Sequence, residues 1–111
     1  ATAICLNGGR FKVDVTWKTP DGRTGTAHTV PLTDHSGYLR FFNADNVEAI
    51  VKVLDACSFA SRFWVFAGGL TNVETALKVT DSRTGVVRTY NNPQGTAFAP
   101  IQDTSACATC P

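Results

Sequence analysis

The chain has 111 residues, a net charge of +1, 43% hydrophobic and 17% charged residues, and four cysteines, which suits one globular domain with a two-layer core. No apolar run reaches the ~18 residues of a membrane-spanning helix, so we expect no membrane span. The ten basic residues are scattered along the chain. This argues against nucleic acid as a partner, because phosphate binding needs a clustered basic face.

The chain contains no methionine and begins Ala-Thr-Ala. Such a start is typical of a mature protein whose signal peptide has been removed, and equally of a trimmed fragment. Four cysteines in so small a chain favour export, because disulfides persist in oxidising compartments. We therefore expect a secreted or cell-surface protein.

The first half of the chain, after a short N-terminal lead-in, carries the patterns of strands and turns. From Arg10 to Lys18 apolar and polar residues alternate, which indicates a strand with one buried and one wet face. Pro20-Asp21-Gly22 supplies a turn, and a threonine-rich return strand runs from Thr24 to Val30. A loop from Leu32 to Gly37 then leads into an aromatic strand from Gly37 to Asn43.

The segment from Ala44 to Cys57 fits two patterns. Asp45 as an N-cap and apolar residues at helical spacing suit a helix, whereas period-two alternation suits a strand. An internal repeat favours the strand. Residues 46–55 and 72–81 share Asn, Val, Glu, Lys, Val and Asp at matching positions, and the second copy runs into a hairpin turn. We therefore predict two similar hairpins, over residues 37–55 and 62–81.

The most apolar stretch is Phe63-Trp64-Val65-Phe66. Alternation places Phe63 and Val65 on one face of a strand and Trp64 and Phe66 on the other. A strand that is apolar on both faces is either covered on each side or presents one face to a partner. We select four aromatic residues as a candidate interaction face: Trp64, Phe66, Tyr38 and Phe42.

The C-terminal part reads as two more extended segments. A strand over residues 86–90 precedes Asn91-Asn92-Pro93, and a last extended segment over residues 96–102 leads to a short cysteine-containing tail. Seven or eight short strands at this spacing predict an all-β fold, an immunoglobulin-like antiparallel β-sandwich stabilised by disulfides. The Cys-Trp-Cys spacing of a true immunoglobulin domain is absent. Residues 1–111 are expected to form one domain.

Five segments together resemble a bacterial domain family whose members occur in predicted exported proteins, repeated or appended to other domains. The segments are Cys5–Phe11, Ala44–Cys57, Phe63–Glu74, Thr80–Gly85 and Pro100–Ser105. The resemblance covers nearly the whole chain and implies an exported module, with no catalytic or binding residue to carry over. Relatives usually have an aromatic residue where this chain has Cys107, so we expect its disulfide pattern to be particular to this protein.

We expect structural disulfides from all four cysteines: Cys5, Cys57, Cys107 and Cys110. The last two form a C-x-x-C pair, but no helix follows to lower a thiol pKa for redox work. Their spacing to His28 and His35 matches no common zinc site. The least strained pairing joins each of the first two cysteines to one tail cysteine, and an interchain bond is the open alternative.

No residue set predicts catalysis, a cofactor or a metal site. Asp34-His35-Ser36 has the composition of a catalytic triad, but neighbours on one loop cannot adopt its geometry. Glu48 and Glu74 hold equivalent places in the repeat, where solvated carboxylates are commoner than acid–base pairs. The turns at Asp21 and Asp81 offer too few oxygen ligands for calcium. We therefore expect a protein that is not an enzyme.

These features predict a non-catalytic extracellular structural module that self-associates into a filament, fibre or surface layer, or that mediates adhesion. Its partners would be copies of itself or other surface proteins, docked on strand edges or on the aromatic face. The alternative is a carbohydrate-binding accessory module that stacks polysaccharide on Trp or Tyr. A second alternative is a small protease inhibitor that presents the loop from Leu32 to Gly37.

Overall fold

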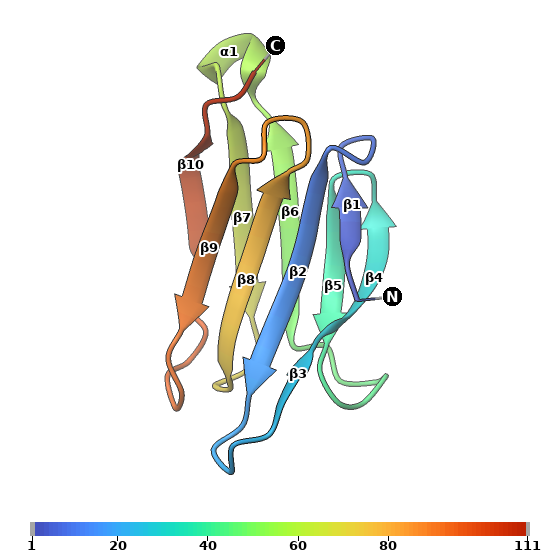
Figure 1. The fold of residues 1–111 in the computed structure, drawn as a ribbon, viewed down its shortest axis with the longest axis vertical. Coiled ribbons are helices and arrows are strands. Elements are labelled where there is room, and N and C mark those ends of the chain that lie inside the picture. Colours follow the sequence, from blue (N-terminus) through green and yellow to red (C-terminus); the bar gives the residue numbers. More distant parts are fainter. Residues whose placement is uncertain (1, 111) are drawn as a thin grey trace.

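The computed structural model describes residues 2–110, which form ten strands and one short helix (Figure 1). The elements in chain order are β1 (Ile4–Leu6), β2 (Phe11–Lys18), β3 (Thr24–Thr26), β4 (His28–Thr33), β5 (Ser36–Arg40), β6 (Ala49–Asp55), α1 (Cys57–Ala60), β7 (Phe63–Gly69), β8 (Glu74–Asp81), β9 (Val87–Asn92) and β10 (Ile101–Cys107). Sheet A has the order β1-β2-β8-β9, with β3 also paired to β2, and sheet B has the order β10-β7-β6-β5-β4. All pairings are antiparallel, and the two sheets stack as a sandwich 44 Å long. The predicted all-β sandwich is confirmed, with more strands than the seven or eight expected.

The hydrophobic core lies between the sheets and follows from period-two alternation. In β2, Phe11, Val13 and Val15 are fully buried, whereas Lys12 and Thr16 face water. Sheet B contributes its own inward residues, and each fully buried side chain of this kind stabilises the fold by roughly 1.5–3 kcal/mol. The other large apolar side chains with no exposed surface are Leu6, Leu39, Val51, Val53, Val65, Leu77 and Val79.

The ambiguous segment over residues 44–57 contains a strand, as predicted. β6 covers Ala49–Asp55 and buries Val51 and Val53, while residues 44–48 form the preceding loop. The only helical turn within residues 2–110 is α1, which ends at Ala60 because the C-cap residue Ser61 has a left-handed φ of 57°. Branched side chains that fit a pleated surface explain why the strand forms here.

One of the two predicted hairpins is confirmed and the other is wrong. Residues 37–55 contain the antiparallel pair β5–β6. Residues 62–81 do not form a hairpin, because β7 lies in sheet B and β8 in sheet A. β8 instead pairs along all eight of its residues with β2, from Phe11 opposite Asp81 to Lys18 opposite Glu74. The hairpin turn that follows is confirmed, since β8 pairs with β9 and Gly85 adopts a φ of +79° there.

Three other sequence-based boundaries need correction. The expected return strand from Thr24 to Val30 divides at Ala27 into β3 of sheet A and β4 of sheet B. The N-terminal lead-in contains β1, which pairs with β2. The last strand is β10, so Cys107 belongs to a strand and not to a tail. Each of these segments is short or bulged, and its pairing depends on residues far away in the sequence.

Two neighbouring glycines in β7 offer a matched test of the packing. A Cβ at Gly69 would lie 2.4 Å from the Phe98 Cβ atom, whereas a Cβ at Gly68 would meet nothing within 4 Å. We predict that Gly69→Ala destabilises the protein by about 1–3 kcal/mol through overpacking. Gly68→Ala should be neutral or slightly stabilising, because glycine weakens a strand interior. Urea denaturation of both variants checks this, and equal stabilities would contradict it.

Candidate interaction face

The outer face of sheet B carries the aromatic residues that the sequence singled out. In β7, Phe63 and Val65 are buried, whereas Trp64 and Phe66 alternate to the outside and are half-buried. Their rings meet edge to face, with centroids 6.1 Å apart. Tyr38 of β5 is half-buried on the same face, two strands away. No further strand layer lies on this side of sheet B within residues 2–110, so the rings are only partly covered.

Three further apolar side chains belong to this face and were not selected from the sequence. Ile50 of β6 is 49% exposed and lies opposite Tyr38, and Leu54 lies opposite Trp64. Alternation with the buried valines of β6 could have identified both. Phe59 of α1 is 72% exposed and packs edge to face on Trp64, with centroids 5.3 Å apart. No sequence signal placed it there, because α1 was not predicted.

Phe42 does not belong to this cluster. The chain leaves β5 at Arg40, and the Phe42 ring then packs edge to face on Trp17 of β2, with centroids 4.7 Å apart. Trp17 also contacts Phe41. The selection of Phe42 as part of one face with Trp64 is therefore corrected, because the backbone turns away from the sheet at that point.

A shallow groove of about 390 Å³ crosses the outer face of sheet B between β6, β7 and β10. Gly68 and Ile50 face each other across the strand pair, and the missing side chain at Gly68 leaves the depression. The Lys52 ammonium, which also lines the groove, lies over the Phe66 ring, 5.3 Å from its centre. Gln102 of β10 lies opposite Phe66. The groove thus combines an apolar floor with one cationic and one amide side chain.

The outer face of sheet A is different in character. Its outward residues in β2 are Lys12, Asp14, Thr16 and Lys18, and those in β8 are Glu74, Ala76, Lys78 and Thr80. Charges of both signs and threonines alternate with the buried residues, as in an ordinary wet sheet surface. Among residues 2–110, sheet B therefore presents the more apolar outer face.

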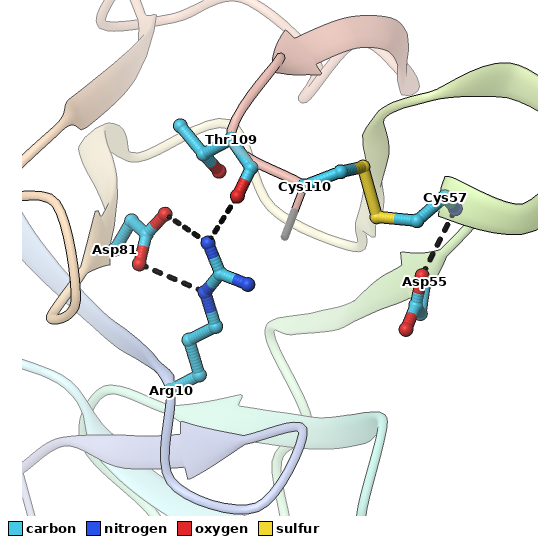
Figure 2. The surroundings of a disulfide bond; sticks show 6 residues. All are labelled: Arg10, Asp55, Cys57, Asp81, Thr109 and Cys110. Atoms are coloured by element: carbon cyan, nitrogen blue, oxygen red, sulfur yellow. Dashed lines mark hydrogen bonds and ion pairs between the residues drawn. A yellow bond between two sulfur atoms is a disulfide. The ribbon is translucent and has the colours of Figure 1, made fainter.

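The C-terminal segment meets α1 at one end of the sandwich (Figure 1), and the disulfide joins them there (Figure 2). Cys57 and Cys110 are bonded, with Cα atoms 5.7 Å apart. The expected second bond is not formed. Cys5 is an exposed thiol on the outer side of β1, whereas Cys107 is buried in β10, where burial raises the pKa of its thiol. The Cys5 side chain faces solvent and the Cys107 side chain faces the core. The two thiols therefore cannot meet, and the expected bond between them is absent.

A buried ion pair beside the disulfide was also not predicted. The Arg10 guanidinium donates to both carboxylate oxygens of Asp81 at 3.0 Å, and also to the backbone carbonyl of Thr109 (Figure 2). The Asp81 side chain has no exposed surface, and the Arg10 side chain is 12% exposed. Arg10 thus fixes the residue next to Cys110. Asp81, which the sequence suggested only as a turn residue, is a central part of this end.

The sequence-based candidates for chemistry do not converge. His35 forms a hydrogen bond with the Asn7 side chain, and Asp34 accepts one from the backbone N–H of Gly8, so both stabilise the contact between the β4–β5 turn and the β1–β2 turn. Ser36 forms a hydrogen bond with Thr33 across the β4–β5 turn. Glu74 begins β8 opposite Lys18 in sheet A, whereas Glu48 is buried before β6 of sheet B, where burial raises its pKa.

The remaining sequence-based candidates, Asp21, His28 and the segment from Leu32 to Gly37, lie in turns and strands. Asp21 pairs with Arg23 in an exposed turn, and His28 is exposed on the edge strand β4. The expected loop from Leu32 to Gly37 is mostly strand, since Thr33 pairs with Ser36. Within residues 2–110, no group of three or more His, Cys, Asp or Glu side chains could hold a metal ion. In the same residues, no helix is long and apolar enough to cross a membrane.

No protein-family model, curated protein or solved structure matches this chain.

Proposed function

We propose that this chain is a non-catalytic extracellular structural module that associates with copies of itself through the outer face of sheet B. The observation that supports this most directly is the cluster of Trp64, Phe66, Ile50 and Phe59, whose side chains are exposed or half-buried on the outer face of sheet B. Contiguous apolar surface of this kind is typical of protein docking sites. The Cys57–Cys110 disulfide is consistent with export.

The arrangement of the rings favours a protein partner over carbohydrate. Stacking on sugars needs open aromatic faces, but the Trp64 and Phe66 rings lie at 81° to each other and the Lys52 ammonium lies over Phe66. A protein side chain can fill the angle between such rings. Carbohydrate binding therefore has less support, and retention on a polysaccharide column that is lost in Phe66→Ala would reverse this preference.

A single truncation on the face should weaken self-association. We predict that Ile50→Ser raises the dissociation constant tenfold or more, because loss of a central apolar contact costs about 1.4 kcal/mol or more. Ile50 is already 49% exposed, so the variant should fold normally. Sedimentation velocity over a range of concentrations, with circular dichroism as a check of folding, measures the effect.

Val87→Ser is the matched control, because Val87 is 45% exposed on β9 of sheet A. It should associate like the unmodified chain. A chain that stays monomeric at the highest concentration, or equal weakening by both variants, would contradict the proposal.

A further inference from the structure

The charges on the outer face of sheet B are all of one sign. Two charged residues alternate to the outside of its strands, Arg40 of β5 and Lys52 of β6, and no residue that alternates to the same side is acidic. If two copies packed this face on itself, their basic groups would meet, at a cost in free energy. The surface that covers this face should therefore carry carboxylates.

The same chain has an acidic and apolar projection at one end of the sandwich. The loop of residues 43–47 between β5 and β6 is exposed throughout and carries Asp45 together with Val47, which is 39% exposed. Leu70, the most exposed large apolar residue at 78%, lies beside it, because its N–H donates to the Glu48 carbonyl at 2.8 Å. Within residues 2–110 nothing engages the Asp45 carboxylate.

This projection is already ordered in the free chain. The Asn43 side chain accepts from the Asp45 N–H at 2.9 Å, and the Asn43 carbonyl accepts from the Asn46 N–H at 3.0 Å. A loop that is held in this way loses little conformational entropy on docking. Its apolar side chains and its carboxylate match the chemistry of the groove, which offers an apolar floor at Gly68 and Ile50 and a cation at Lys52.

We propose that the groove on sheet B receives the 43–47 loop and Leu70 of a second copy, with Asp45 of that copy paired to Lys52. This inference rests on the proposed self-association and specifies its geometry. The contact is heterologous, since the loop and the groove are different surfaces of the same chain. Repetition of such a contact joins copies head to tail into an open chain or a closed ring.

Charge reversal tests the pairing, with sedimentation velocity of the full chain as the measurement. Lys52→Glu and Asp45→Lys should each raise the dissociation constant tenfold or more, because each places like charges together. The double variant should return to within about threefold of the unmodified chain, because it restores opposite charges with their positions exchanged. An equimolar mixture of the two single variants should also associate. Lys78→Glu, an exposed site on β8 of sheet A, is the control and should have no effect.

The outcomes separate this geometry from the function on which it rests. If the unmodified chain associates but the double variant is no better than either single variant, the loop-in-groove contact is wrong and self-association stands. Association that is indifferent to both single variants also overturns the contact. A monomer at all concentrations overturns both proposals.

Discussion

Replacing Asp81 with asparagine is expected to destabilise the protein by about 3–5 kcal/mol, because it leaves a buried guanidinium without its counter-ion. The Asp81 side chain has no exposed surface, and Arg10 binds it through two parallel hydrogen bonds of 3.0 Å. Paired hydrogen bonds of this geometry are the strongest form of the arginine–carboxylate interaction. Guanidinium chloride denaturation at pH 7 measures the loss.

The loss should depend on pH in a defined direction. Burial alone would raise the pKa of Asp81, but the hydrogen bonds that it accepts, led by that from Arg10, hold the pKa well below its usual range. A carboxyl with a depressed folded-state pKa stabilises the fold fully above its unfolded pKa of about 3.9 and loses this contribution as the pH falls through the folded value. The stability difference between the unmodified chain and Asp81→Asn should therefore narrow below about pH 4.

Asp21→Asn is the matched control for this prediction. Asp21 also bonds an arginine, Arg23, at 3.0 Å, but both side chains are mostly exposed. Water and salt screen such a pair, so this variant should not change stability measurably. If Asp81→Asn behaved like Asp21→Asn, the buried pair would have no stabilising role.

Alternation along the sequence was enough to predict which apolar side chains of β2 and β7 are buried. It placed Phe11, Val13 and Val15 inward in β2, and it separated Val65 from Trp64 in β7, as the structure confirms. Period-two patterns succeed here because a strand has only two faces, and one of them must meet the core.

The assignment of strands to sheets could not be predicted in the same way. β7 and β8 are separated by only four residues, which suggested a hairpin, yet β8 pairs with β2 some sixty residues earlier. The alternation within a strand does not identify the strand it pairs with, because inward-facing residues are apolar in both sheets. The error in the 62–81 hairpin follows from this.

The same limit applies to the groups at the disulfide end. Arg10 and Asp81 are 71 residues apart, and their pairing depends on the β2–β8 register. The sequence did not show which way the Cys5 side chain points, so a disulfide was expected there. In the structure, the pairing of β1 with β2 directs Cys5 toward solvent. Phe59 joins the aromatic face because α1 positions it beside Trp64. Each of these features depends on contacts between distant segments.

Removing the disulfide by Cys57→Ser together with Cys110→Ser is expected to cost about 2–4 kcal/mol. The two cysteines are 53 residues apart in sequence. In the chain-entropy description, the cross-link raises the free energy of the unfolded state by about 4 kcal/mol for a loop of this length, which sets the upper end of the range. Denaturation of the double variant, and of the unmodified chain with reductant, should give the same loss.

Cys5→Ser is the control, because Cys5 is an exposed free thiol, and it should leave the stability unchanged. Equal stability of the disulfide variant and this control would contradict the prediction. If oxidant stabilised the Cys5→Ser variant but not the unmodified chain, the three remaining cysteines would be paired differently in that variant.

The two restraints at this end should also be coupled. The disulfide holds Cys110, and Arg10 binds the carbonyl of the adjacent Thr109, so either restraint keeps the C-terminal segment beside β8 and α1 (Figure 2). Without the disulfide, that segment can leave Arg10, and part of the benefit of the Arg10–Asp81 pair is lost with it. A double-mutant cycle between Asp81→Asn and the disulfide variant should therefore give an interaction energy of about 0.5–3 kcal/mol. Strict additivity would mean that the segment is fixed by other contacts.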